Sequence, residues 1–294
     1  MLILISDAFD ASLESKLQQF GEVTTDKTRA SEADVILVRA KTICDKAYID
    51  AAKNAKLIIR GGVGIDNIDK AYAESKGIIV RNTPKASSIA VAELTFALML
   101  SAPNHIITYH NGMKNGEWLK NIKRTELYGK TLGLLGIGNI ATKVAERAKA
   151  FGMNVVAYDK YVSSSAVATL VPTVEDAVKD ADYISIHMPL TDETRNMFNA
   201  DLFAKMNRKP VIINAARGAI VNADDMVKAL DDGQVTCYCA DVYPSDPPAP
   251  DYPLLKSDKV ILTPHVGANS KENLLRIGDE IVATIKDLKD NGKI

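Results

Sequence analysis

Short apolar runs alternate with amphipathic segments along the whole chain. In the first part, runs of mainly β-branched and aliphatic residues lie at 2–6, 35–38, 57–59 and 78–80. Segments with a helical distribution of apolar positions, such as residues 11–20, separate these runs. Alternating strands and helices are typical of a parallel sheet with helices on its faces. The first part of the chain is therefore predicted to be an α/β domain.

A second series of strands follows an apolar segment that is predicted to be one long helix, residues 88–109. An amphipathic C-terminal helix is predicted at residues 269–291. Six strands with intervening helices form one complete doubly wound dinucleotide-binding unit. The predicted fold class is therefore α/β, with two doubly wound parallel sheets. The six runs expected to form the second sheet are 131–136, 154–159, 183–187, 211–215, 236–241 and 260–265.

The composition gives no sign that nucleic acid or a membrane is a partner. At 294 residues, the chain is long enough for about two domains with their own cores. A formal net charge of -1 gives no overall attraction to nucleic acid or to an anionic membrane, so neither is expected as a partner. The longest apolar window, residues 88–100, contains Glu93 and is too short to span a membrane.

The three cysteines, Cys44, Cys237 and Cys239, suit a reducing compartment, and the cytoplasm is expected. Cys237 and Cys239 alternate along an expected strand, so both thiols should face the same side of the sheet. No other cysteine or nearby histidine completes a set of metal ligands with them. Packing is therefore the favoured interpretation of the pair, and no metal site is expected.

A glycine-rich turn near the middle of the chain has the context of a dinucleotide-binding loop. Gly136 permits a tight turn, Gly138 allows a pyrophosphate to approach the backbone, and Ala141 is small enough for the helix to pack on the strand. The next strand ends at Asp159, where a carboxylate can bind both ribose hydroxyls and repel a 2′-phosphate. NAD is therefore the expected cofactor, although the neighbouring Lys160 weakens the preference over NADP.

Three polar residues follow the later strands, where ligands bind in doubly wound sheets. They are Arg217, Asp246 and His265. Each has an ordinary alternative: a surface ion pair for the arginine, a turn for Asp-Pro, and a structural role for the histidine. Together, behind a dinucleotide-binding unit, they supply what reduction of a 2-keto acid requires, namely a proton donor and a fixed cation beside the carbonyl oxygen. A carboxylate bonded to the second ring nitrogen would hold the imidazole in place.

Over essentially its whole length the chain resembles the D-isomer-specific 2-hydroxyacid dehydrogenase family, and within it the short 3-phosphoglycerate dehydrogenases. The resemblance implies that a dinucleotide domain, residues 99–268, is inserted in a flavodoxin-like substrate domain, residues 1–98 with 269–294. The motifs that carry it are IIRGGVGIDNID (58–69), NTPKASSIAVAEL (82–94), the segment from YGKTLG to VVAYD (128–159), HMPLTDET (187–194), NAARGAIVN (214–222), DVYPSDPP (241–248) and TPHVGANS (263–270).

The resemblance also assigns roles to individual residues. It implies that Arg217 binds the carboxylate and carbonyl of the substrate and that His265 is the general acid and base. Asp246 stands where the family normally has a glutamate, which shortens the arm by one methylene. The cofactor is expected to contact Gly136, Gly138, Asn139, Ile140, Asp159, Met188, Pro189, Ala215, Asp241, Gly267 and Ala268, with Asp241 at the nicotinamide amide.

In the substrate domain, the backbone at Gly62 and Val63 resembles the loop that binds the substrate carboxylate. Phosphoglycerate-type members resemble this chain in having arginines at the positions of Arg39 and Arg60, and two guanidinium groups suit a dianionic phosphate. The expected reaction is therefore the oxidation of D-3-phosphoglycerate to 3-phosphohydroxypyruvate, the first step of serine biosynthesis. The alternative is that both arginines pair with acids of their own domain, and the substrate is then hydroxypyruvate, glyoxylate or another unphosphorylated acid.

Three further expectations come from the same resemblance. Family members are usually homodimers joined through the dinucleotide domain, and Trp118 is a candidate for the interface or for packing on its own domain. The regulatory tail of longer relatives is not expected beyond the C-terminal helix. A non-enzymatic regulator that senses NAD is the remaining alternative, because some proteins of this fold have that role and Asp246 could weaken the acid-base pair.

Overall fold

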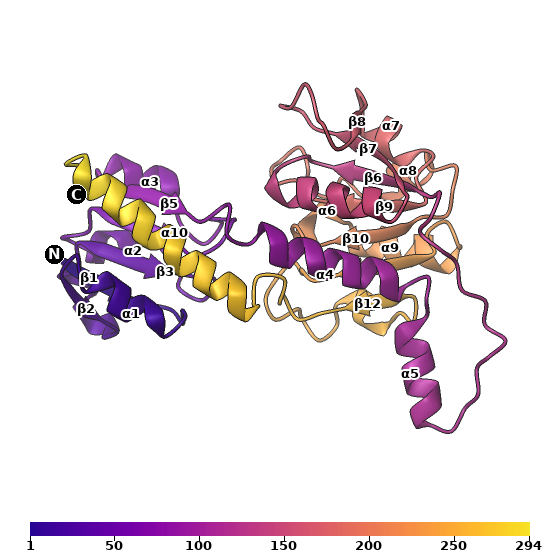
Figure 1. Cartoon of the computed structure of the whole chain (residues 1–294), viewed down its shortest axis with the longest axis horizontal. Coiled ribbons are helices and arrows are strands. Elements are labelled where there is room, and N and C mark those ends of the chain that lie inside the picture. The colour runs from indigo at the N-terminus through magenta and orange to yellow at the C-terminus, as the bar shows by residue number, and fades with distance from the viewer. The chain divides into compact units, whose positions relative to one another are not determined.

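The computed structural model describes all residues from 1 to 294, and the chain forms two compact units (Figure 1). Residues 1–90 and 268–294 form one unit, and residues 91–267 form the other. The chain therefore completes the second unit before it returns to the first. Both the observed boundary and the expected one, after residue 98, lie inside helix α4 (Ser88–Ser101).

The first unit contains a five-stranded parallel sheet in the order β2-β1-β3-β4-β5. This is the flavodoxin-like order of doubly wound sheets, so the predicted fold class is confirmed. Every residue of β1 and β3 is buried, as expected for strands covered on both faces. The analysis of the sequence missed β2, an edge strand with no fully buried residue. The strands are β1 (Leu2–Ile5), β2 (Glu22–Thr24), β3 (Val35–Val38), β4 (Leu57–Arg60) and β5 (Ile79–Asn82).

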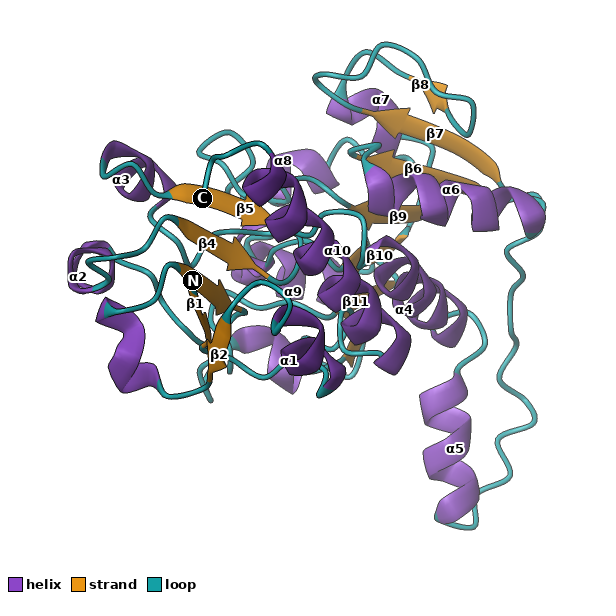
Figure 2. Ribbon diagram, turned by 60° about the vertical axis from the view of Figure 1, so that its left-hand side comes forward, coloured by secondary structure: helices purple, strands orange, loops and turns teal.

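Helices cover both faces of this first sheet (Figure 2). Alternate residues of β1, β3 and β4 pack against α1 and α10 on one face and against α2 and α3 on the other. The C-terminal helix presents a buried stripe, Ile277, Ile281, Ile285 and Leu288, at the spacing of an amphipathic helix. That stripe ties the end of the chain to the first unit. The helices are α1 (Ser12–Leu17), η1 (Lys27–Ser31), α2 (Lys46–Ala51), α3 (Lys70–Ser75) and α10 (Lys271–Asp290).

The second unit contains a seven-stranded parallel sheet in the order β12-β11-β10-β9-β6-β7-β8. Numbered within the unit, this is the dinucleotide-binding order 3-2-1-4-5-6 with one more strand at the end. The six predicted strands are confirmed, and β8 was missed because it has only two residues. The strands are β6 (Thr131–Leu135), β7 (Asn154–Tyr158), β8 (Thr169–Leu170), β9 (Tyr183–Ile186), β10 (Val211–Asn214), β11 (Cys237–Ala240) and β12 (Val260–Leu262).

Two hydrophobic clusters hold the helices of the second unit on its sheet. One contains residues of α4 and α6, and the other contains residues of α7, α8 and α9. Cys239 packs in the first cluster, and its Sγ lies 3.9 Å from that of Cys237, so both thiols face the same side as predicted. The elements are α6 (Asn139–Ala150), α7 (Val174–Val178), α8 (Ala200–Phe203), η2 (Gly218–Ile220), α9 (Ala223–Asp231) and η3 (Pro253–Lys256).

The single long helix predicted over residues 88–109 is wrong, because the segment forms α4 and a separate helix, α5 (Ile106–Lys114). Pro103 lies in the break, and a proline disfavours helical backbone both at its own position and at the preceding residue. His105 then takes a left-handed conformation, with φ of 51°, at the start of α5. No single helix is long and apolar enough to cross a membrane, and only α4 and α5 together, bent by 64°, reach that length and composition.

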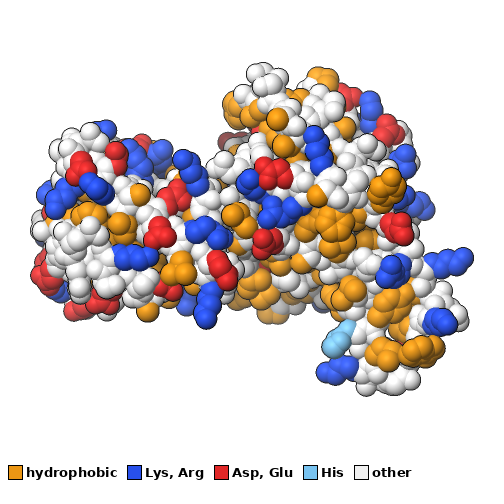
Figure 3. Space-filling view, in the orientation of Figure 1, with side chains coloured by type: hydrophobic (Ala, Val, Ile, Leu, Met, Phe, Trp, Pro, Cys, Tyr) orange, Lys and Arg blue, Asp and Glu red, His pale blue; other side chains and the backbone are white.

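Helix α5 and the loop after it expose a group of large apolar side chains, which the space-filling view shows at the lower end of the second unit (Figure 3). Trp118 is 75% exposed, so it does not pack on its own domain. The other members of the group are Ile106, Ile107 and Met113, each about half exposed. Contiguous exposed apolar side chains mark surfaces that other molecules cover.

Candidate functional site

The Arg217 loop begins where β10 ends. Asn214, the last residue of β10, is completely buried, and its side chain shapes the turn. The Asn214 amide nitrogen donates to the carbonyl of Arg217 at 2.9 Å, and its oxygen accepts the backbone N–H of Ala216 at 3.0 Å. The half-buried Arg217 side chain therefore extends from a turn whose backbone is held by Asn214, the last residue of the strand. One guanidinium nitrogen of Arg217 donates to the carbonyl of Ala216 at 2.6 Å.

The loop after β11 lies directly against the Arg217 loop. A Cβ at Gly218 would lie 2.2 Å from the carbonyl carbon of Tyr243, so only glycine permits this approach. Tyr243 also donates from its hydroxyl to the carbonyl of Thr263 at 2.8 Å, immediately after β12. Tyr243 thereby connects the loops that follow β10, β11 and β12, which carry the three predicted catalytic residues.

His265 and Asp246 are in direct contact. Nδ1 of His265 donates to Oδ2 of Asp246, so the carboxylate reaches the ring despite its short arm. His265 has φ of 53°, and its backbone N–H donates to the carbonyl of Thr263 at 3.0 Å. About two fifths of each side chain is exposed, 41% for His265 and 47% for Asp246. A fixed imidazole with its other nitrogen directed away from the carboxylate can exchange a proton with a bound molecule.

Asp241 holds the segment that follows His265. Its side chain is buried, with Oδ1 accepting from the hydroxyl of Thr263 at 2.6 Å and from the N–H of Val266 at 2.8 Å. Oδ2 accepts from the N–H of Gly267 at 2.8 Å. A Cβ at Gly267 would lie 2.9 Å from that oxygen, so the glycine lets the loop approach the carboxylate. Asp241 therefore fixes the backbone of this loop by hydrogen bonds. The sequence predicted only a contact of Asp241 with the nicotinamide amide and not this structural role.

The glycine-rich turn has the backbone that its motif requires. Gly136 has φ of +91°, and a Cβ there would lie 2.8 Å from the carbonyl oxygen of His187. At Gly138, by contrast, a Cβ would meet no protein atom within 4 Å. Gly138 is the N-cap of α6 and no side chain caps this helix, and a helix N-terminus of this kind suits an anion. Ala141 is completely buried against the sheet, as expected.

Asp159 lies at the end of β7 and ties the glycine-rich turn to its own loop. Oδ2 accepts the N–H of Ile137 at 2.9 Å, and Oδ1 accepts the N–H of Tyr161 at 2.8 Å and that of Val162 at 3.2 Å. A carboxylate has about four acceptor positions, so three amide contacts leave one for a further donor. Lys160 is turned to Glu193, with Nζ at 2.7 and 2.8 Å from its two oxygens.

The remaining predicted cofactor residues lie in the same loops or next to them. Met188 is buried beside Gly136, whereas Pro189 is exposed and Ala215 is partly exposed. Ala268 belongs to the first unit, where its carbonyl accepts from the side chain of Asn273 at 2.7 Å. Asn139 and Ile140 form the first turn of α6.

His187 is a residue that reasoning from the sequence missed. It follows β9, and its Nε2 shares a hydrogen bond of 2.9 Å with the hydroxyl of the buried Ser185. Burial lowers the pKa of His187 from 6.5 to about 4, so the ring is neutral at physiological pH. Its carbonyl also faces Gly136. The HMP sequence gave a signal, because a histidine directly after a strand of such a sheet lies at the ligand edge.

The predicted substrate residues lie at the ends of β3 and β4 of the first unit. Arg39 follows β3, Arg60 is the last residue of β4, and Gly62 and Val63 lie in the loop after it. The Arg60 guanidinium lies over Gly62, where a Cβ would be 1.6 Å from Nη1, so the structure brings these two residues together. Gly62 has φ of +146°. The carbonyl of Val63 accepts from the Asn82 side chain at 2.5 Å, which holds this loop to β5. Gly61 is packed against Phe9, so it cannot be replaced without moving that ring.

Arg39 is held by the loop after β1. Its backbone N–H donates to the buried carboxylate of Asp7 at 2.6 Å, and Nη1 donates to the carbonyl of Ala8 at 3.3 Å. Burial lowers the pKa of Arg39, and the charge of Asp7 opposes that change. Asp7 also accepts two hydrogen bonds from Thr42. Asp7 accepts from the backbone N–H of Arg39 and the guanidinium group donates to a carbonyl, so the alternative that Arg39 pairs with acids of its own domain stays a hypothesis.

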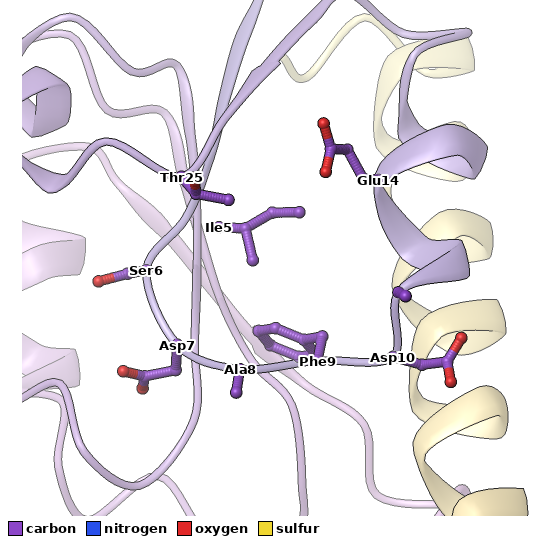
Figure 4. Close-up of a pocket in the computed structure, with 9 residues that line it drawn as sticks. Ile5, Ser6, Asp7, Ala8, Phe9, Asp10, Glu14 and Thr25 are labelled. Carbon is purple, nitrogen blue, oxygen red and sulfur yellow. The ribbon is translucent and has the colours of Figure 1, made fainter.

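A cavity of about 340 Å³ opens beside the end of β1, but it contains none of the four predicted substrate residues. Its lining includes Ile5, Phe9 and Thr25, with the carboxylates of Asp10 and Glu14 near its edge (Figure 4). Asp7 also lines it, while its carboxylate is bonded to Arg39 and Thr42. None of the nine residues that line this cavity is a lysine or an arginine, and three of them are acidic, which does not suit a phosphate or a carboxylate.

The second unit fits a bound dinucleotide. Gly136 is required by its backbone, Gly138 leaves the N-terminus of α6 open, and Asp159 lies at the end of the next strand. A pyrophosphate at such a helix terminus and a ribose at such a carboxylate are the contacts that this sheet provides.

Comparisons with known proteins agree with this geometry. The family profile described as D-isomer specific 2-hydroxyacid dehydrogenase, NAD binding domain, matches residues 96–267. A D-3-phosphoglycerate dehydrogenase of Methanocaldococcus jannaschii is 41% identical over 97% of this chain and 56% of its own length. A hydroxypyruvate reductase of Thermotoga maritima is 41% identical over 86% of this chain and 84% of its own length.

Solved structures give the same likeness over the whole chain. A D-lactate dehydrogenase of Aquifex aeolicus, complexed with NAD and lactic acid, has a TM-score of 0.87 and 28% identity, covering 100% of this chain and 96% of its own. The chain spans about half the length of the curated D-3-phosphoglycerate dehydrogenases that it matches, 56% and 49% for two of them.

Proposed function

Because the chain belongs to the D-isomer-specific 2-hydroxyacid dehydrogenase family, we propose that it interconverts a D-2-hydroxy acid and the corresponding 2-keto acid with NAD. The contact between His265 and Asp246 carries this proposal. It lies after β11 and β12 of the unit that matches the NAD-binding domain, at the edge of the sheet where ligands bind. A histidine held by a carboxylate at that edge is the acid-base group that such a reaction needs.

The residues of the second unit have separate tasks in this reaction. His265 donates a proton to the carbonyl oxygen during reduction and accepts it during oxidation, while Asp246 fixes the orientation of the ring. Arg217 binds the carboxylate and polarises the carbonyl with its planar guanidinium group. When bound, NADH supplies the hydride. The glycine-rich turn, Asp159 and the loops at 188–189, 215 and 267–268 would hold the cofactor.

The proposed substrate is 3-phosphohydroxypyruvate, with D-3-phosphoglycerate as the product of reduction. Support comes from Arg39 and Arg60, and from the named activity of the Methanocaldococcus jannaschii relative. The backbone of Gly62 and Val63 would take the carboxylate. Residues 1–98 with 269–294 are the proposed substrate domain, and 99–268 the proposed NAD-binding domain. Hydroxypyruvate is the second candidate, because the Thermotoga maritima relative is named for its reduction.

We propose a homodimer in which the exposed apolar group of α5 and Trp118 is covered by a second copy. Support comes from the exposure of these side chains, because such groups are covered in stable assemblies. The three free thiols support a reducing compartment such as the cytoplasm.

The proposal is tested by reduction of 3-phosphohydroxypyruvate, hydroxypyruvate, glyoxylate and pyruvate with NADH, followed as loss of nicotinamide absorbance. We expect the phosphorylated acid to have the highest kcat/KM. Arg60→Ala should remove that advantage, at least tenfold, because one guanidinium on a phosphate contributes about 1.5–3 kcal/mol. Arg81→Ala is the matched control, since Arg81 is an exposed arginine on the neighbouring strand β5.

His265→Asn separates the chemistry from binding. It should abolish turnover of every acid while NADH binding, measured by calorimetry, is retained. An unphosphorylated acid as the best substrate would contradict the substrate proposal but leave the reaction class intact. NADH binding by the unmodified protein without turnover of any acid would contradict the enzymatic role and favour a sensor of NAD.

A further inference from the structure

A lysine-glutamate pair crosses the carboxyl end of strand β6. Lys160 follows β7 and Glu193 follows β9, and β6 lies between these two strands in the sheet. The Lys160 ammonium contacts both oxygens of Glu193, at 2.7 and 2.8 Å. The glycine-rich turn follows β6, and Asp159 is the residue before Lys160. The ion pair therefore lies next to this turn, on the same side as Asp159.

Lys160 and Glu193 both extend from backbone that is held by hydrogen bonds. Asp159, the residue before Lys160, accepts the N–H groups of Tyr161 and Val162. Glu193 lies in a turn in which the hydroxyl of Thr194 donates to the carbonyl of Pro189 at 2.7 Å and accepts the N–H of Thr191 at 2.8 Å. The turn closes with the N–H of Arg195 donating to Thr191 at 2.9 Å. Both backbone segments are already held by these hydrogen bonds, so formation of the ion pair does not have to order them.

The pair decides which charge the ribose end of the cofactor site presents. A free lysine next to Asp159 would be a suitable partner for a 2′-phosphate, because a cation at this place is how such sheets accept NADP. With Lys160 bonded to Glu193, the three charged side chains of Asp159, Lys160 and Glu193 have a net charge of -1. That charge repels a dianionic 2′-phosphate and does not affect a ribose hydroxyl.

We propose that Glu193 is a specificity-determining residue, which keeps Lys160 from a 2′-phosphate and so makes the site selective for NAD over NADP. This inference rests on the proposed function only through the cofactor site. Its test therefore measures binding and needs no turnover. Glu193 acts 33 residues away along the chain from Lys160.

The test is calorimetric titration of NADH and NADPH into the unmodified protein and into Glu193→Gln. The glutamine keeps the size of the side chain and removes its charge. We expect NADPH affinity to rise about three- to tenfold, the scale of one exposed ion pair plus one removed repulsion, with NADH affinity changing less than about twofold. Glu175→Gln is the control, because Glu175 forms a comparable surface pair with Lys205 at 2.7 Å and should leave both affinities unchanged.

The double variant Lys160→Ala, Glu193→Gln identifies the cation. Under the proposal it loses the gain in NADPH affinity, since the gain comes from the released lysine. The proposal is overturned if Glu193→Gln leaves the ratio of the two affinities unchanged, or if the double variant keeps the gain. Failure of the protein to bind either nucleotide would instead contradict the cofactor assignment itself, whereas NADH binding without catalysis would contradict only the proposed reaction.

Discussion

The hydroxyl of Tyr243 donates a 2.8 Å hydrogen bond to the backbone carbonyl of Thr263. Tyr243 is in the loop that leads to Asp246, and Thr263 starts the segment that leads to His265. The bond therefore fixes the two loops whose side chains form the proposed acid-base pair. Tyr243 forms no hydrogen bond with either side chain of that pair and acts as a positioning residue.

Removing this hydroxyl should loosen the pair without destroying the fold. We expect Tyr243→Phe to lower the free energy of unfolding by about 0.5–1.5 kcal/mol, the value of one ordinary hydrogen bond. The kcat of the proposed reduction should fall several-fold with little change in KM, since the substrate contacts remain. Tyr252→Phe removes a hydroxyl from the neighbouring aromatic ring, 6.1 Å away between centroids, and should change neither quantity. Equal effects of both substitutions would show that Tyr243 has no positioning role.

The strands that were predicted correctly from the sequence have continuous apolar residues, and the strands that were missed do not. Strands β1, β3 and β6 are almost completely buried and gave clear signals. Strands β2 and β8 lie away from the centre of their sheets and contain few buried residues, so their formation depends on the neighbouring strand rather than on their own composition. The break between α4 and α5 was visible at Pro103, but the apolar pattern on both sides outweighed it.

For the candidate site, the sequence identified residue types at strand ends and the bond of a carboxylate to the imidazole, but not the contacts that depend on the order of the strands. Motifs placed Asp246 and His265 in the right loops, because the ends of parallel strands share one edge of a sheet. The bond between Lys160 and Glu193 required the order of β9, β6 and β7, which no local pattern contains. The role of Asp241 in holding Gly267 was also missed, since it depends on backbone N–H groups and not on side-chain identity.

The two glycines of the dinucleotide-binding turn should respond differently to alanine. Gly136→Ala should destabilise the protein by about 1–3 kcal/mol, because its positive φ and the nearby carbonyl of His187 oppose a side chain. Gly138→Ala should leave stability unchanged or raise it by up to about 1 kcal/mol, since its backbone is extended and no protein atom is near. It should nevertheless weaken NADH binding at least tenfold. Thermal unfolding and calorimetry distinguish the two effects, and unimpaired NADH binding by Gly138→Ala would contradict the proposed pyrophosphate site.

Replacing Asp246 with the longer glutamate should lower activity rather than raise it. The aspartate carboxylate already contacts Nδ1 of His265, so the added methylene of Asp246→Glu would displace either the ring or the loop. We expect about a tenfold lower kcat with unchanged NADH affinity, because proton transfer depends on a geometry held within about half an ångström. Asp246→Asn keeps the length and should lose more, since the charge that supports the protonated ring is gone. A higher kcat for the glutamate variant would show that the shorter arm limits the natural enzyme.

His187 should make the stability of the fold depend on pH. Its pKa is about 4 in the folded protein and near 6.5 when exposed, so between these values the unfolded chain binds more protons. Stability therefore falls as the pH is lowered from 6.5 to 4, by an amount on the order of 2–3 kcal/mol at most. Urea unfolding at pH 7.0 and pH 4.5 measures this difference.

The contribution of His187 is isolated by comparing two histidine substitutions. His187→Gln keeps a polar partner for the hydroxyl of Ser185 and cannot take up a proton, so its stability should depend less on pH over this interval. His110→Gln removes an exposed histidine on α5 and should retain the full dependence of the unmodified protein. Burial raises the pKa of Asp7, but its hydrogen bonds to Arg39 and Thr42 outweigh burial and leave that pKa lowered. Carboxylates of this kind contribute a common background in all three proteins. The same loss of stability in His187→Gln as in His110→Gln would show that protonation of His187 does not oppose folding.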